Sequence, residues 1–211
     1  MKKIINRNYF ENKYWRKYDH LVGIDEVGRG SWAGPIVVAG CIFPKWYTNN
    51  ELKDSKKLSI KKRKDLFECI KKDALGYHIV FIDASEVDKL NPKQASIKGM
   101  KMVFDQILPK PDFALIDGET INTLENKSLS IIEGDNKSIS IAAASILAKV
   151  TRDNYMVSID KKYLGYDFAK HKGYGTLLHL QNLKNKGPIR NFHRFSYRPI
   201  QNILHYIKER N

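Results

Sequence analysis

The 211-residue sequence has little cysteine, no long hydrophobic run and no low-complexity segment. Its two cysteines, Cys41 and Cys69, stand far apart and outside any CxxC pattern. This excludes a disulfide framework and a cysteine-based zinc site, and it favours a reducing, cytoplasmic setting. No apolar stretch is long enough to span a membrane, and the first residues contain no apolar core of a secretory signal. We therefore expect a cytoplasmic protein without a membrane partner.

The sequence also lacks internal repeats and linkers rich in glycine, serine or proline. A chain of this length buries roughly 70–75% of its unfolded surface on folding, which suffices for a core without disulfides or a structural metal. We expect one domain over residues 20–211, preceded by an N-terminal extension, residues 1–19, that packs on it as a cover.

Acidic residues are scarce relative to basic ones. The sequence contains 37 Lys and Arg against 23 Asp and Glu, giving a net charge of +14. Such an excess is typical of proteins that bind a polyanion, most often nucleic acid. A lysine-rich surface that only confers solubility remains the alternative.

Apolar, β-branched runs alternate with longer segments of helical periodicity. The runs predict strands covered on both faces, at 21–24, 36–43, 77–82, 113–116 and 129–132. Apolar spacing predicts helices at 60–73, with Ser59 as N-cap, and at 94–107, 138–163 and 176–186, the last ending before Gly187-Pro188. Together they predict an α/β domain with one central sheet.

Three of the predicted strands end in acidic residues. These are Asp25-Glu26, Asp117, and Glu133-Gly134-Asp135. If the strands are neighbours, their ends form the sheet edge where ligands collect in open α/β folds. Each aspartate alone is also a common turn residue beside glycine. The spacing leaves open whether Asp135 or Glu133 belongs to the group, and whether Glu119 joins it.

Clustered carboxylates require protons or a counter-charge. Oxygen ligands without imidazole suit Mg²⁺ or Mn²⁺, and a metal-loaded acidic site in a basic protein suits phosphodiester hydrolysis. Adjacent strand residues face opposite ways, so we expect the strand to loosen at Asp25-Glu26 or Glu26 to reach round. Gly28 and Gly30 free the backbone to turn and to approach a phosphate or sugar.

Five segments resemble, in this order, successive motifs of bacterial type 2 ribonuclease H (RNase HII), over about residues 20–200. They are GIDEVGRGSWAGPIVVAG, LKDSKKLS, LIDG, GDNKSISIAAASILAKVTRD and HKGYGT. The resemblance implies a ribonuclease H-like fold, in which helices flank a central mixed five-stranded sheet and the C-terminal part is helical.

The resemblance also implies the site residues. The metal-binding catalytic acids would be Asp25, Glu26, Asp117 and Asp135, holding two Mn²⁺ or Mg²⁺ ions during catalysis. The substrate-binding residues would be Gly28, Arg29 and Gly30, which read the ribose 2′-hydroxyl, Tyr174, which stacks on the next sugar, and Lys56 and Lys57, which contact phosphate. A solvated charge run is the alternative for the two lysines.

The implied activity is an endonuclease that hydrolyses the RNA strand of RNA–DNA hybrids. It would also nick duplex DNA 5′ of embedded ribonucleotides, leaving 3′-hydroxyl and 5′-phosphate ends, and so serve ribonucleotide and RNA primer removal. The family favours a monomer. An idle nucleic-acid-binding protein and a DNA-only resolvase are rivals, but the complete acid set and the Gly-Arg-Gly loop with Tyr174 argue against them. The type 3 enzyme, another rival, lacks this Gly-Arg-Gly signature.

Some residues depart from the family pattern or carry weaker expectations. Ser31-Trp32 replaces a pair that commonly has a small or aliphatic second residue, and Gly175 stands where proline is commoner. We expect Lys149, Arg152 and Asp153 to form an ion pair within their helix. We expect the histidines to make packing or backbone contacts rather than to act in catalysis: His171, His179 and His193.

Overall fold

The computed structural model of the protein describes residues 8–52 and 58–210, so Lys56 and Lys57 lie outside the described residues. The strands are β1 (Leu21–Val27), β2 (Ile36–Ile42), β3 (Gly76–Ile82), β4 (Phe113–Asp117) and β5 (Ser128–Ile131). The α-helices are α1 (Tyr9–Tyr14), α2 (Ile60–Asp73), α3 (Ala84–Leu90), α4 (Pro92–Gln106), α5 (Ile139–Asp160), α6 (Phe168–His171), α7 (Leu177–Lys186) and α8 (Arg198–Arg210). Two short 3₁₀ helices, η2 (Asn122–Lys127) and η3 (Gly134–Asn136), flank β5.

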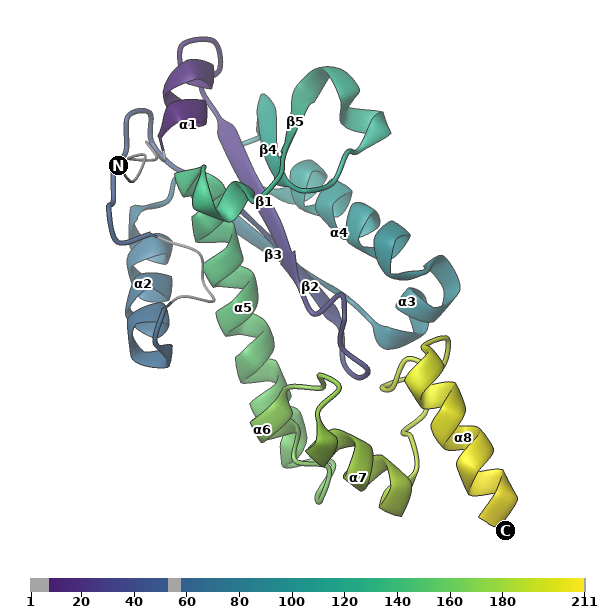
Figure 1. Cartoon of the computed structure of the whole chain (residues 1–211). Helices are drawn as coiled ribbons and strands as arrows, with labels where there is room; N and C mark the ends of the chain where they lie inside the picture. The colour runs from purple at the N-terminus through teal and green to yellow at the C-terminus, as the bar shows by residue number, and fades with distance from the viewer. Residues whose placement is uncertain (1–7, 53–57, 211) are drawn as a thin grey trace, which may run out of the picture. The chain divides into compact units, whose positions relative to one another are not determined.

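The strands form one mixed five-stranded sheet in the order β3-β2-β1-β4-β5. Figure 1 labels each strand. β1 pairs in parallel with β4, from Leu21 opposite Phe113 to Ile24 opposite Ile116. β4 pairs in parallel with β5, and Asp117 stands opposite Ile131. The carboxyl ends of these three strands therefore meet at one edge, where the predicted acids lie.

Helices cover both faces of the sheet at β1 and β2. Gly23 of β1 lies directly beneath the backbone of Ser140 and Ile141, at the start of α5. Gly40 of β2 instead faces the side chain of Val103 on α4. The small residues of α5 make this close approach possible, since Ala142, Ala143 and Ala144 are all fully buried.

The five predicted strands and four predicted helices are present, with ends shifted by a few residues. The predicted cap of α2 is confirmed, because the Ser59 hydroxyl accepts a hydrogen bond from the backbone N–H of Lys62 at 3.2 Å. The sequence reading gave no definite prediction for α1, α3 and α6, all of which are seven residues or shorter, or for α8.

The chain divides into two compact units that interleave along the sequence. The first comprises residues up to Val27, Val38–Val80 and Ile97–Val150, and it holds all four predicted catalytic acids. The second comprises Gly28–Val37, Phe81–Ser96 and Thr151 onward, and it holds the Gly-Arg-Gly loop and Tyr174. The single-domain expectation for residues 20–211 stays a prediction. Among the described residues, no helix is both long enough and apolar enough to cross a membrane.

Candidate active site

Strand register brings Asp25 and Asp117 to the same level of the sheet. Ile24 of β1 stands opposite Ile116 of β4, so the next residue of each strand, Asp25 and Asp117, continues the same register. Neighbouring strands lie about 4.8 Å apart, and residues level with each other in a parallel pair point to the same face. Two acids separated by 92 positions in the chain are thus neighbours because the strands are parallel.

The Asp25–Glu26 pair lies inside β1, so of the two expected alternatives the loosened strand is absent and a Glu26 side chain that reaches round remains. Strand alternation sends the two side chains to opposite sides, so Asp25 is buried, with 6% of its surface exposed, while Glu26 is half-buried. The backbone N–H of Glu26 donates a hydrogen bond to Asp25 Oδ1 at 2.7 Å. The longer Glu26 side chain is therefore the one that must bend to share a ligand with Asp25.

Asp25 is electrostatically coupled to the neighbouring acids. Burial raises the pKa of Asp25 well above its ordinary value, and the negative charges of Glu26 and Asp117 raise it further. The buried hydroxyl of Ser145, on α5, acts in the opposite direction through a hydrogen bond to this carboxylate. Ser145 thus contacts the site itself, beyond its place on the closely packed helix face.

Asp135 is held next to Asp117 by the turn that follows β5. The backbone N–H of Gly134 donates a 2.6 Å hydrogen bond to Asp117 Oδ1. Asp135 follows in η3 with 6% of its surface exposed, and it accepts a hydrogen bond from the Asn136 amide at 3.2 Å. Glu133 is exposed and has left-handed backbone. Burial beside Asp117 therefore favours Asp135 over Glu133, the alternative that the strand pattern left open.

The donor set of this acidic group has the chemistry of a site for a hard cation. It consists of carboxylate oxygens, the ligands that Mg²⁺ and Mn²⁺ prefer. The pKa of Asp25 is raised first by burial and then by repulsion from Glu26 and Asp117, and a cation would relieve that repulsion. Within residues 8–52 and 58–210, no three His, Cys, Asp or Glu side chains already stand in the arrangement of a metal cage. The acids fit such an ion by type and proximity, and their side chains must converge further to hold one.

The Gly-Arg-Gly loop is held through its backbone by two residues of the C-terminal segment. Arg194, fully buried, donates to the carbonyl of Arg29 at 2.8 Å and to that of Gly34 at 2.9 Å. The Tyr197 hydroxyl also donates to the Arg29 carbonyl, at 2.5 Å. Gly28 has a φ of 91°, in a region that favours glycine. A Cβ on Gly30 would meet no atom within 4 Å, so that position faces open space.

Arg152 supports Tyr174 and makes three hydrogen bonds outside its own helix, so the expected ion pair among Lys149, Arg152 and Asp153 stays a prediction. Its guanidinium donates to the carbonyls of Pro35, Lys172 and Ala33 at 2.9–3.1 Å. The group lies 5.2 Å from the centre of the Tyr174 ring, within the range of a cation–π contact. Burial lowers the pKa of Arg152 to about 10, so the guanidinium keeps its charge at neutral pH.

The three histidines form a buried cluster whose hydrogen bonds reach the backbone, as expected. The backbone N–H of Ile189 donates to His193 Nδ1 at 2.8 Å, which leaves the proton of His193 on Nε2. That nitrogen lies 3.1 Å from His179 Nε2, so His179 in turn carries its proton on Nδ1 and donates it to the Tyr174 carbonyl at 3.0 Å. This series of hydrogen bonds ends on the Tyr174 carbonyl, and it requires the rings of His193 and His179 to be neutral.

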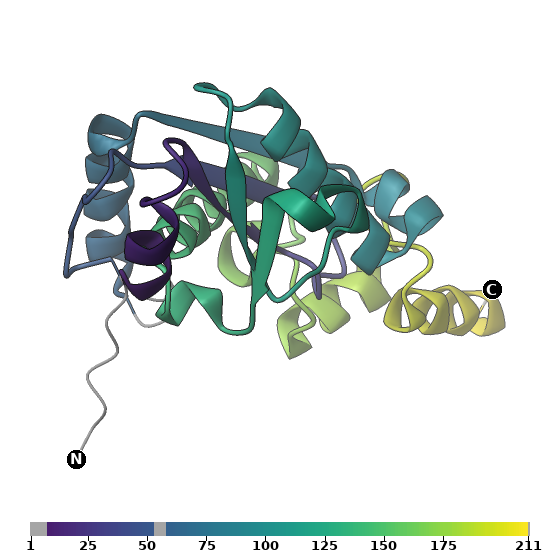
Figure 2. The same cartoon turned by 90° about the horizontal axis from the view of Figure 1, so that it is seen from above.

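Several of these contacts had no signal in the sequence. Arg194 and Tyr197 lie outside the five motifs that carry the family resemblance. The N-terminal extension supplies a further contact: the buried carboxylate of Glu11 accepts from the Ser138 hydroxyl at 2.5 Å and the Ser140 N–H at 3.0 Å. Figures 1 and 2 both show α1 beside the start of α5.

Comparison with known proteins gives consistent results. The family model for Ribonuclease HII matches residues 22–200. Ribonuclease HII of Mycoplasma capricolum subsp. capricolum is 48% identical over 205 residues, covering 95% of this chain and 98% of that protein. The crystal structure of ribonuclease H2 from Pyrococcus horikoshii OT3 matches with a TM-score of 0.78 at 20% identity, over 90% of this chain and 99% of that chain. The structure of Bst-RNase HIII in complex with Mn²⁺ matches with a TM-score of 0.70 at 17% identity, over 90% and 70% of the two chains. The two structural matches confirm the predicted fold class.

Proposed function

The chain belongs to the ribonuclease HII family, and on that basis we propose that it nicks duplex DNA 5′ of an embedded ribonucleotide. As a ribonuclease HII it is an endonuclease that cleaves the RNA of RNA–DNA hybrids. The proposed nick leaves a 3′-hydroxyl and a 5′-phosphate, products suited to ribonucleotide and RNA primer removal. The observation that carries the proposal is that the negative charges of Glu26 and Asp117 act on the buried Asp25 in a protein of net charge +14.

We propose that Asp25, Glu26, Asp117 and Asp135 hold two divalent cations, Mn²⁺ or Mg²⁺. The structure of Bst-RNase HIII in complex with Mn²⁺ supports this choice of metal by analogy of fold. When bound, such ions lower the pKa of an attacking water and stabilise charge on the departing 3′-oxygen. The protein itself orients the carboxylates. Ser145 forms a hydrogen bond with Asp25, and the Gly134 N–H donates one to Asp117.

We propose that ribose recognition belongs to Gly28, Arg29, Gly30 and Tyr174. Gly28 follows Glu26 by two residues, and two trans peptide units span at most about 7 Å, so the sensor and the acids are covalently close. Arg194 and Tyr197 hold the loop by its carbonyls, which leaves the backbone amide groups to approach a sugar. Tyr174 would stack on the sugar that follows the ribonucleotide.

The protein would bind its duplex mainly through lysine and arginine contacts with phosphates. By resemblance, Lys56 and Lys57 contribute to these contacts and the protein acts as a monomer. The partners proposed are RNA–DNA hybrids and ribonucleotide-containing duplex DNA.

The test is cleavage of an end-labelled DNA duplex that contains one ribonucleotide, in Mg²⁺, Mn²⁺ or EDTA. We expect a single nick 5′ of the ribonucleotide with either metal, none with EDTA, and none in the all-DNA duplex of the same sequence. Mapping the ends should give a 3′-hydroxyl and a 5′-phosphate. A nick 3′ of the ribonucleotide, or cleavage that survives the chelator, would contradict the proposal.

Carboxamide variants provide the matched controls. Asp25→Asn and Asp135→Asn should each reduce turnover by several orders of magnitude, because a neutral amide cannot stabilise the cations. Both variants should retain duplex binding, measured by fluorescence anisotropy. Glu133→Gln, an exposed acid two residues before Asp135, should cleave at the wild-type rate.

A further inference from the structure

The ring of Trp32 occupies the space beside Gly175 that a side chain would need. A Cβ added to Gly175 would lie 2.3 Å from Cε2 and Cζ2 of Trp32 and 2.7 Å from its Nε1. No carbon atom tolerates such distances, so Gly175 is required by this contact. Trp32 and Gly175 are two of the positions that depart from the family pattern, and they form one packed pair.

The backbone of Trp32 holds the other neighbour of Tyr174. The N–H groups of Trp32 and Ala33 both donate to the Gly173 carbonyl, at 2.8 and 3.2 Å. Trp32 therefore contacts the residue before Tyr174 through hydrogen bonding and the residue after it through its ring. These contacts limit how the short segment 173–175 can move.

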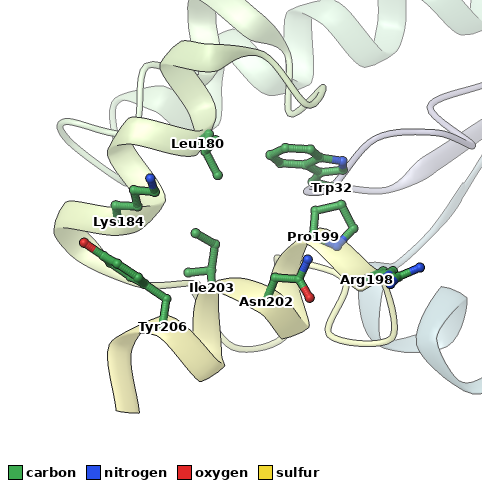
Figure 3. Close-up of a pocket in the computed structure, with 8 residues that line it drawn as sticks. All are labelled: Trp32, Leu180, Lys184, Arg198, Pro199, Asn202, Ile203 and Tyr206. Carbon is green, nitrogen blue, oxygen red and sulfur yellow. The ribbon is translucent and has the colours of Figure 1, made fainter. Parts of the chain in front are cut away.

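Trp32 also packs against the histidine that holds Tyr174. The rings of Trp32 and His179 lie 5.5 Å apart, and His179 donates to the Tyr174 carbonyl. Trp32 is in turn backed by the C-terminal helices. It lines a hollow of about 390 Å³ together with residues of α7 and α8, among them Leu180 and Pro199, as Figure 3 shows.

We propose that Trp32 is a positioning residue that sets where the Tyr174 ring stands, by filling the space beside Gly175. The inference rests on the proposed role of Tyr174 in stacking on the sugar. Arg152 restrains the Tyr174 ring through its cation–π contact. Trp32 restrains the backbone on either side of Tyr174. Gly175 has no side chain that could restrain the segment 173–175. In this chain the large side chain of Trp32 restrains that segment instead.

The pair predicts compensation between two substitutions. Gly175→Ala adds a carbon where the Trp32 ring already lies, so the segment 173–175 must shift. Trp32→Leu removes the ring and leaves that segment unsupported. Combining them supplies a methyl group at 175 and makes room for it, so the double variant should recover much of what each single variant loses.

The experiment measures kcat and KM for nicking the single-ribonucleotide duplex, with urea unfolding to show that each variant is folded. We expect Trp32→Leu and Gly175→Ala each to lower kcat roughly tenfold, as misplacement of a substrate-orienting group does. The double variant should return to within about threefold of wild type, because coupled residues are not additive. Asn202→Ala, an exposed α8 residue that lines the same hollow, should leave kcat unchanged.

A Tyr174→Ala background separates positioning from general stability. There, Trp32→Leu should have no further effect on kcat, since the ring it positions is gone. Two results would overturn the inference. One is a further loss of kcat when Trp32→Leu is made in the Tyr174→Ala background. The other is a Trp32→Leu/Gly175→Ala variant whose loss of kcat is the product of the two single losses. The proposed function fails differently, since wild-type protein would then make no nick at the ribonucleotide.

Discussion

At the scale of single residues, Glu11 is a buried acid that lies in the N-terminal extension, outside the motifs that carry the family resemblance. Its Oε1 accepts two hydrogen bonds at the start of α5, while Oε2 is buried and has no hydrogen-bond partner among the residues that the structure describes. A negative charge at a helix N-terminus is favourable, but burial is the larger effect and raises the pKa of Glu11 above its ordinary 4.5. The uncharged carboxyl group is therefore the form that the fold favours.

We expect Glu11→Ala to lower the free energy of unfolding by about 2–4 kcal/mol, because it leaves the O–H of Ser138 and the N–H of Ser140 buried without their acceptor. Glu11→Gln keeps the acceptor oxygen and should be tolerated. Urea unfolding at pH 8 measures both, with Lys13→Ala, an exposed change on the same helix, as control.

The pH dependence of Glu11 has a defined sign. Because the folded state raises its pKa, the stability it contributes is present below pH 4.5 and is lost as the pH rises through the raised value. Glu11→Gln has no such loss, so the variant should match or exceed wild-type stability at pH 8. A glutamine variant as unstable as the alanine variant would show that the charged form is the one that the fold requires.

At the scale of elements, the segment from α6 to the start of α8 depends on neutral histidines. The rings of His171 and His179 stack 4.2 Å apart, and His179 lies against His193. Burial lowers the pKa of His179 to about 4 and that of His193 to about 3, and each neighbouring histidine lowers it further. Protonation would place like charges side by side within a buried cluster.

We therefore expect the stability of the protein to fall as the pH drops from 6.5 toward 4. In this range the unfolded histidines bind protons that the folded ones do not, so each contributes a slope of up to about 1.4 kcal/mol per pH unit. Urea unfolding at several pH values measures the slope, and His193→Gln should reduce it. Asn202→Ala, a change of an exposed and uncharged residue of α8, is the control and should leave the slope unchanged.

At the scale of the whole molecule, the net charge of +14 governs binding to duplexes. The affinity for a duplex should fall with salt, with a slope of log K against log salt of about −0.9 for each phosphate neutralised. The Asp25→Asn variant allows this measurement without cleavage.

We expect the single-ribonucleotide duplex and the all-DNA duplex to give parallel salt lines, offset by a constant ratio. Recognition of one hydroxyl by Gly28–Gly30 and stacking by Tyr174 neutralise no phosphate, so they change affinity without changing the slope. Fluorescence anisotropy from low to moderate salt measures both lines. A steeper line for the ribonucleotide duplex would mean that ribose recognition recruits further cationic contacts.

Much of the fold followed from local pattern. The period of apolar residues predicted five strands and the longer helices, because each pattern reports which face of its own element is buried. The short helices were not predicted, since α1, α3 and α6 span too few residues to show a period. The four acids were named by resemblance, and the parallel register of β1 with β4 is what makes Asp25 and Asp117 neighbours.

The sequence by itself determined the fold class and the family, and it named the four proposed acids by resemblance, because these depend on residue types in short motifs. Only the tertiary structure decided the partners of the supporting residues. Glu11 meets Ser138 from 127 positions away, and Arg194 reaches Arg29 across 165. The contact of Trp32 with Gly175 likewise depends on how distant segments pack. A local pattern tells whether a residue is buried, but its partner is set by close packing in three dimensions.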